Sequence, residues 1–188
     1  MNIILGSSSK FRQHAFTQVT PDFTCLAPDV DEKAIRDDDP KRLTLKIAHA
    51  KADALMPNII EPSILVTADQ VVVFKGIIRE KPDSEAQCRT FLKSYSNNAV
   101  EVVNGVVVTN TETGKRAEGI DTVRVMFETI PDHAIDELIK EGDALHCAGG
   151  LKGVCSLLRP YVASMKGTPE SLQGVPVALI KRLMEEVR

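Results

Sequence analysis

Long hydrophobic runs are missing from this 188-residue sequence. Its apolar stretches, such as Ile3 to Leu5 and Val71 to Phe74, are far shorter than the roughly 20 residues that cross a bilayer. The first residues show neither a basic segment nor a small-residue cleavage site, which are the marks of a secretory signal. We therefore expect a cytoplasmic protein that has no membrane partner.

Cysteine is scarce and shows no pattern. The four cysteines, Cys25, Cys88, Cys147 and Cys155, include no C-x-x-C pair. This spacing indicates neither a zinc site nor a disulfide framework, so reduced thiols in a cytosolic protein are the simplest interpretation. The four histidines form no H-x-x-x-H or H-E-x-x-H pair, and a histidine-based mechanism is not predicted.

A basic excess is also missing, because the formal net charge is -3 at pH 7. Proteins that bind nucleic acid normally carry a basic face or stripe, so nucleic acid is not an expected partner. With 43% hydrophobic and 26% charged residues, the chain is typical of a soluble globular protein. Its length fits a single domain spanning residues 1–188. An anionic ligand would then be held by a few converging cations.

Several catalytic motifs are absent. The sequence contains no G-x-x-x-x-G-K-[ST] and no G-x-G-x-x-G, which disfavours P-loop and Rossmann nucleotide sites. It has no G-x-S-x-G elbow and no cysteine with an evident histidine partner, which disfavours a covalent nucleophile. The remaining mechanism for a hydrolase is attack by a metal-activated water.

Hydrophobic periodicity predicts an irregular alternation of strands and helices. We expect strands at 2–6, 23–26, 63–67, 71–74, 100–110 and 120–127, and helices at 10–19, 40–56, 83–93, 131–141 and 175–187. The polar trio Ala68-Asp69-Gln70 is expected to separate two strands, and Lys75-Gly76 to form a hairpin turn. This mixture predicts an α/β or α+β fold with a mixed sheet.

Polar residues where predicted elements begin and end form a candidate site. Ser7-Ser8-Ser9 precedes a helix, whose free N–H groups attract phosphate, although serines before helices are mostly ordinary N-caps. Arg12 lies one turn into that helix and could direct its guanidinium to phosphate beside the loop. Asp69 lies between two apolar runs, a position where carboxylates often bind metal or act as a base. The alternative is an ordinary turn aspartate.

Three more charged residues are candidates with common structural alternatives. Glu32 could supply a second carboxylate for Mg²⁺ or Mn²⁺, although a loop acid is usually solvated. Lys51 flanks the apolar stripe of the long helix, where it either extends to solvent or faces a cleft. Lys81 precedes Pro82, whose extended backbone could direct the ammonium inward, and the alternative is a surface lysine.

Six short motifs occur in order along nearly the whole chain. They are Ser7-x-Ser9-x-x-Arg12, Asp29-Val30-Asp31-Glu32, Ala48-x-x-Lys51-Ala52, Ala68-Asp69-Gln70, Glu80-Lys81-Pro82 and Gly174-Val175-Pro176. Together they resemble the Maf family of nucleotide pyrophosphatases, also called septum formation inhibitor proteins. Each motif is weak alone, and the specificity comes from their order and spacing.

The resemblance implies an elongated fold with two lobes around a central cleft, often a homodimer. The implied activity is metal-dependent hydrolysis of a nucleoside triphosphate (NTP) to the monophosphate and pyrophosphate, with Mg²⁺ or Mn²⁺. The roles implied by similarity are phosphate binding by Ser7, Ser9 and Arg12, neutralisation of the leaving pyrophosphate by Lys51 and Lys81, base catalysis by Asp69, and metal binding by Glu32 with Asp69.

The resemblance also bears on the nucleobase. Gln70 and the stretch 146–152, which includes Lys152, look more like the subgroup acting on 7-methyl-GTP than the one acting on dTTP and UTP. Phe11 occupies a variable position of the first motif and is expected to contact substrate. Val154 stands where one subgroup carries an acid and the other Gln, so 7-methyl-GTP and a pyrimidine or modified nucleotide both stay open.

Two alternatives to this enzyme have different sequence requirements. A non-enzymatic regulator of septum formation would keep a nucleotide-binding cleft without needing Asp69, Lys51 and Lys81. An inosine triphosphate pyrophosphatase of a related fold would show a different opening motif, so Ser7-Ser8-Ser9 and Arg12 disfavour it.

Overall fold

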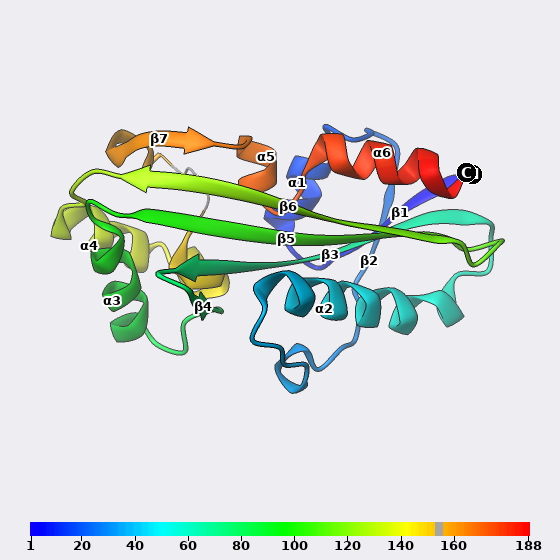
Figure 1. The fold of residues 1–188 in the computed structure, drawn as a ribbon, viewed down its shortest axis with the longest axis horizontal. Helices are drawn as coiled ribbons and strands as arrows, with labels where there is room; N and C mark the ends of the chain where they lie inside the picture. The colour runs from blue at the N-terminus through cyan, green and yellow to red at the C-terminus, as the bar shows by residue number, and fades with distance from the viewer. Residues whose placement is uncertain (153–155) are drawn as a thin grey trace. The chain divides into compact units, whose positions relative to one another are not determined.

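The computed structural model describes residues 1–152 and 156–188, which form a seven-stranded mixed sheet with helices (Figure 1). The strands are β1 (Asn2–Gly6), β2 (Thr24–Leu26), β3 (Ser63–Phe74), β4 (Ile77–Arg79), β5 (Ala99–Asn110), β6 (Arg116–Phe127) and β7 (Val162–Lys166). The helices are α1 (Lys10–Phe16), α2 (Pro40–Leu55), α3 (Glu85–Tyr95), α4 (Asp132–Lys140), α5 (Pro169–Leu172) and α6 (Val177–Val187). None of the described helices is long and apolar enough to cross a membrane.

The sheet combines parallel and antiparallel neighbours, which confirms the predicted mixed α/β class. Its strand order is β2-β1-β3-β5-β6-β7, and β4 pairs with β3 outside this path. Strand β1 runs parallel to β2 and β3, whereas the β3–β4 and β6–β7 pairs are antiparallel. Parallel pairs require long crossover connections, which α1 and α2 supply here.

The chain divides into two compact units. Unit 1 comprises Met1–Gln70, Asn104–Asp121 and Gln173–Arg188, and unit 2 comprises Val71–Val103 and Thr122–Leu172. Each unit contains its own buried hydrophobic clusters, two in unit 1 and one in unit 2.

In unit 1, helices cover both faces of the sheet. Leu5 and Val66 belong to a cluster that includes residues of α1 and α6, whereas Ile4 and Leu65 pack with residues of α2. Successive side chains of a strand point to opposite faces, so neighbours on β1 and β3 enter different clusters. Figure 1 shows α1 and α6 above these strands and α2 below them.

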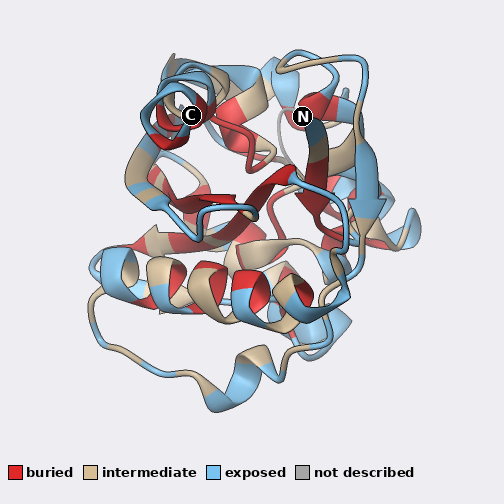
Figure 2. Ribbon diagram, turned by 90° about the vertical axis from the view of Figure 1, so that its right-hand side faces the viewer, coloured by how far each residue is buried: buried red, intermediate tan, exposed pale blue. Residues whose placement is uncertain are grey.

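Helix α2 forms as its apolar spacing predicts. Asp39 caps its N-terminus by accepting a 2.8 Å hydrogen bond from the Lys41 N–H, and Pro40 occupies the first turn. Its buried residues are Leu43, Thr44, Ile47, Ala48, Lys51, Ala52 and Leu55. In Figure 2, where α2 is the long helix in the lower half, these residues recur on one side of the helix. A charged residue, Lys51, therefore lies on the buried side.

Strand β3 is continuous, so the predicted interruption at 68–70 is wrong. Asp69 is only 7% exposed and lies inside the strand. The parallel partner β1 ends opposite Thr67, and β3 runs on beyond that point. The polar residues suggested a turn, but their groups are paired with side chains from elsewhere in the chain, which local sequence cannot show.

Unit 2 is organised around Tyr95. Its ring lies 5.4 Å from Phe74 and 6.4 Å from Phe127, measured between centroids, and its hydroxyl donates a 2.8 Å hydrogen bond to the Gly149 carbonyl. Burial raises the pKa of Tyr95 to about 12. The hydrogen bond to Gly149 gives the buried hydroxyl the partner that a polar group in an apolar core requires.

Most element boundaries differ by a few residues from those predicted. The Lys75-Gly76 hairpin is confirmed, with φ of 51° and 79° at the two turn residues and β4 directly following. β7 and α5 were not predicted. β7 has no buried residue in its burial pattern, so it lacks the apolar alternation that identifies a strand.

Candidate active site

The serine loop after β1 is fixed by local hydrogen bonds. The Ser7 hydroxyl accepts from the Ser9 N–H at 3.2 Å, and the Ser9 hydroxyl accepts from the Arg12 N–H at 3.4 Å. Ser9 is thus the N-cap of α1. Gln13 donates from Nε2 to the Ser7 carbonyl at 3.1 Å. Phe11 precedes the arginine on α1 and is 39% exposed.

Arg12 carries an unpaired buried donor. Its Nη1 donates to the Ala68 carbonyl at 3.1 Å, whereas Nε is buried and has no hydrogen-bond partner among the described residues. Burial lowers the pKa of Arg12, and the nearby charges of Asp69 and Glu32 oppose that shift. Buried donors are nearly always paired in folded proteins, so an unpaired donor at Arg12 is unusual.

Lys51 joins two carboxylates. Its Nζ lies 2.8 Å from Asp69 Oδ1 and 3.0 Å from Glu32 Oε1. The Lys51 and Asp69 side chains are 5% and 10% exposed, and that of Glu32 is 40% exposed. Lys51 therefore faces inward and does not extend to solvent. Both predicted metal ligands, Asp69 and Glu32, are therefore bound to the Lys51 ammonium group.

Both cations also approach the same backbone carbonyl. Lys51 Nζ lies 3.4 Å from the Ala68 oxygen, to which Arg12 also donates. Ala68 follows the last residue of β3 that pairs with β1, so the two side chains supply donors where the parallel partner has ended. The resulting cluster of Arg12, Lys51, Asp69 and Glu32 is formally neutral, with two positive and two negative groups.

The cluster lies at a typical ligand-binding position for its topology. Ser7 follows the carboxyl end of β1, Glu32 lies in the segment after β2, and Asp69 lies just past the β1–β3 pairing. Ligands of open parallel α/β sheets bind outside the carboxyl ends of the strands. The sequence prediction therefore selected residues that the fold brings to one edge of unit 1.

Only two carboxylates gather in this cluster. Across residues 1–152 and 156–188, no group of three or more His, Cys, Asp and Glu side chains is placed to hold a metal ion. Mg²⁺ commonly binds proteins through one or two carboxylates and takes its other ligands from water and substrate phosphates. Glu32 and Asp69 therefore fit an ion that arrives with a phosphorylated substrate.

A partly buried chain of polar side chains beside the cluster was not predicted. Gln70 donates from Nε2 to Asn104 Oδ1 at 2.9 Å, and Asn104 donates from Nδ2 to Asp121 Oδ2 at 3.1 Å. Asn104 is completely buried. Its position inside the apolar run Val102 to Val108 could have identified Asn104 from the sequence, because a buried polar residue in a strand needs a hydrogen-bond partner.

We expect Asn104→Ala to lower the free energy of unfolding by about 1–3 kcal/mol, because it removes the acceptor of Gln70 and the donor to Asp121. Urea denaturation measures the change. Asn2→Ala is the matched control, since Asn2 is exposed and bonds an exposed Glu61, and it should cost less than about 0.5 kcal/mol. Equal losses in the two variants would contradict a structural role for the chain.

Lys81 belongs to unit 2. It is exposed and follows β4, and its charge acts on the nearby Cys147 thiol. Burial nevertheless raises the pKa of Cys147 to about 11, so this thiol stays protonated at neutral pH. The Glu80 carbonyl accepts a 2.8 Å hydrogen bond from the Gly149 N–H, which ties the Glu80-Lys81-Pro82 motif to the 146–152 stretch.

Lys152, also in unit 2, is held by two acids. Its Nζ lies 2.8 Å from Glu141 and 2.6 Å from Asp143, and these hydrogen bonds raise its pKa. Its charge is thus balanced within unit 2. Val154, the other predicted contact to the base in this region, lies outside the described residues.

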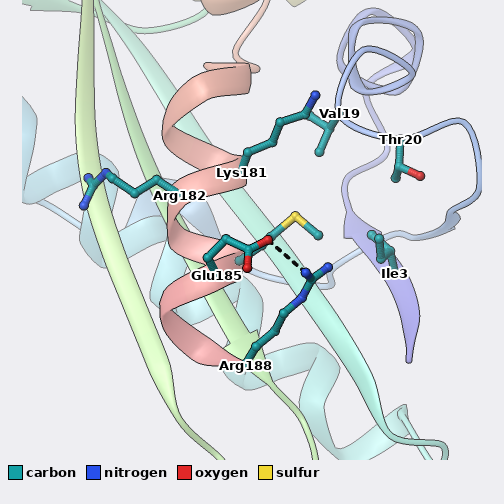
Figure 3. Close-up of a pocket in the computed structure, with 8 residues that line it drawn as sticks. Ile3, Val19, Thr20, Lys181, Arg182, Glu185 and Arg188 are labelled. Atoms are coloured by element: carbon teal, nitrogen blue, oxygen red, sulfur yellow. Dashed lines mark hydrogen bonds and ion pairs between the residues drawn. The ribbon is translucent and has the colours of Figure 1, made fainter.

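A separate pocket in unit 1 shares no residue with the cluster. It has a volume of about 460 Å³ and is lined by Ile3, Val19, Thr20, Lys181, Arg182, Met184, Glu185 and Arg188. Figure 3 shows Lys181 and Arg188 of α6 extending toward Val19 and Ile3, whereas Arg182 points to the opposite side of the helix. Arg182 pairs with Glu186, and Arg188 with Glu185, along the same helix. Two of the three cations that line the pocket are therefore paired with acids of the same helix.

Comparisons with known proteins agree with the motif pattern. A family model described as Maf-like protein matches residues 2–187. A relative from Dictyostelium discoideum, named 7-methyl-GTP pyrophosphatase, is 44% identical over 192 residues, covering 98% of this chain and 96% of the relative.

Two solved structures show weaker likeness. Protein VC0702 from Vibrio cholerae is 16% identical, with a TM-score of 0.45 and coverage of 99% of this chain and 97% of that chain. The Ham1 protein of Staphylococcus aureus is 15% identical, with a TM-score of 0.42 and coverage of 68% and 72%. Such distant likenesses carry no argument about function.

Proposed function

Because this chain belongs to the Maf-like protein family, we propose that it is a nucleoside triphosphate pyrophosphatase, a hydrolase that releases the monophosphate and pyrophosphate. The observation that carries the proposal is the cluster in unit 1, where Lys51 holds Asp69 and Glu32 near the Arg12 guanidinium. Such a site can bind phosphate, hold a divalent ion and accept a proton.

The chemistry assigns a distinct task to each side chain. Asp69 accepts a proton from the attacking water, whose oxygen forms a bond to the α-phosphorus. The bond between that phosphorus and the bridging oxygen breaks, and pyrophosphate leaves with the electron pair. Arg12 donates to a phosphate oxygen from its guanidinium, and Lys51 orients the base.

The charge balance of the cluster supports a requirement for a divalent ion. Two cations already neutralise two carboxylates, so an incoming triphosphate would add uncompensated negative charge. Glu32 and Asp69 would hold Mg²⁺ or Mn²⁺ together with substrate oxygens. When bound, the ion polarises the phosphate and lowers the pKa of the attacking water.

The substrate proposed first is 7-methyl-GTP, which the name of the Dictyostelium relative specifies for that protein. A pyrimidine or modified nucleotide is the second choice. The non-enzymatic regulator is less favoured, because Asp69, Lys51 and Lys81 are all present and the first two are paired in a buried cluster. A homodimer and a role in septum formation stay predictions from the resemblance, and a cytoplasmic location stays a prediction from the composition of the sequence.

The direct test incubates pure protein with 7-methyl-GTP, UTP, dTTP, CTP, GTP or ITP. Each reaction contains Mg²⁺, Mn²⁺ or EDTA, and the products are separated by anion exchange. We expect monophosphate and pyrophosphate in equal amounts with a metal ion, and a loss of at least about 10²-fold in EDTA. Release of diphosphate and phosphate would contradict the reaction. Binding of nucleotide without turnover would favour the regulator.

A further inference from the structure

Gly174 approaches the guanidinium of Arg12 more closely than any side chain would allow. It belongs to the Gly174-Val175-Pro176 motif that precedes α6, and its φ is +82°. A Cβ placed on it would lie 2.9 Å from both Nε and Nη2 of Arg12 and 3.3 Å from Cζ. Cβ atoms in real proteins essentially never come within 3.0 Å of another heavy atom in this way.

The three distances define the direction of this approach. A point above the guanidinium plane and equidistant from Nε and Nη2 would lie nearer to Cζ than to either nitrogen. Here Cζ is the farthest of the three atoms, so the Cβ would lie near the plane, facing the Nε–Nη2 edge. A side chain at position 174 would therefore push against the edge that normally forks onto an oxyanion.

Positive φ alone does not explain why position 174 is a glycine. Gly114 has a similar φ of +73°, and a Cβ there would meet nothing within 4 Å. Lys75 and Asn97 show that this chain also places other residues at positive φ. Position 174 differs because backbone conformation and close approach to Arg12 coincide there.

We propose that Gly174 is a positioning residue for Arg12. Its missing side chain leaves room for the guanidinium to keep Nη1 on the Ala68 carbonyl at 3.1 Å. The role of this glycine is thus to position the phosphate-binding Arg12. The expected effect on activity rests on the proposed function. Arg12 is flexible at its far end, so a bulkier residue would displace the guanidinium more readily than it would unfold the chain.

The test compares Gly174→Ala with Gly114→Ala, a control that introduces the same side chain at positive φ in open space. We expect Gly174→Ala to lower kcat/KM by about 10–100-fold, as a misplaced binding group does, and Gly114→Ala to change it less than about twofold. Melting temperature is measured in parallel. The control should lose about 2–6 °C from backbone strain alone, and Gly174→Ala should lose more.

The Arg12→Ala background distinguishes positioning from general damage. Without the guanidinium, adding Gly174→Ala should change kcat/KM less than about twofold, and its loss in melting temperature should fall to that of Gly114→Ala. An equal fold-loss with and without Arg12 would overturn the proposal. If wild-type protein hydrolyses no nucleotide, the proposed function fails, and the melting temperatures of the same four variants still decide whether Gly174 seats Arg12.

Discussion

We expect Asp69→Asn to lower kcat for nucleotide hydrolysis by about 10²–10⁴-fold, the contribution typical of a positioned general base. The asparagine oxygen can still accept a hydrogen bond from Lys51, which lies 2.8 Å from Oδ1 in the native protein. The amide cannot take a proton from water, however, and it binds a divalent ion more weakly than a carboxylate. Steady-state kinetics with the best substrate from the nucleotide panel measure the loss.

Asp53→Asn is the matched control for this substitution. Asp53 also lies in unit 1 and pairs with a cation, Arg116, at 2.6 Å, but its side chain is 65% exposed and lies outside the cluster. The control should keep kcat within about twofold, since exposed ion pairs contribute little. Wild-type turnover in Asp69→Asn would remove Asp69 from the mechanism and leave Glu32 as the remaining carboxylate of the cluster.

Residues with an unusual local context could be predicted from the sequence. Asp69 stands between two apolar runs, where an acidic residue is rare unless it is paired. Lys51 flanks the apolar stripe of a clear helix. Both proved buried and paired with each other. The motif order then added Arg12 and Glu32, which the fold brings to the same cluster.

The remaining features depend on contacts between distant parts of the chain. The continuity of β3 through Asp69 requires partners for the polar trio that only the folded sheet and α2 provide. Asn104 had a local signal, but Asp121 had none, because an acid in a half-exposed strand is ordinary. Gly174 was visible only as part of a motif, since its close neighbour Arg12 lies near the other end of the sequence.

The cluster has a stability cost that its function explains. Its buried carboxylate, ammonium and guanidinium donor must be removed from water, and a well-packed apolar replacement would often be as stable or more so. The Arg12 Nε is left without a partner in the described chain, which a purely structural residue would avoid. Buried charges kept despite such a cost are typical of functional sites.

Lys51→Met tests this coupling and is expected to lower the free energy of unfolding by about 3–5 kcal/mol. Methionine matches the aliphatic stem but leaves the Asp69 carboxylate buried at 10% exposure with its ammonium partner removed. Glu32 is 40% exposed and can turn to water, so most of the loss should come from Asp69. Adding Asp69→Leu removes the carboxylate that has lost its ammonium partner, and Glu32 remains as a nearby opposite charge for Arg12. The double variant should therefore recover much of the stability, although both variants lose activity.

Lys46→Met provides the comparison on the same helix. Lys46 pairs with Asp37 at 2.7 Å, but its side chain is 53% exposed, and the substitution should cost less than about 1 kcal/mol. Urea denaturation of the two single variants and the double variant measures all three changes. A loss in Lys51→Met no larger than that in Lys46→Met would show that Lys51 does not hold a buried carboxylate. Failure of Asp69→Leu to recover stability would place the cost in packing around the lysine stem.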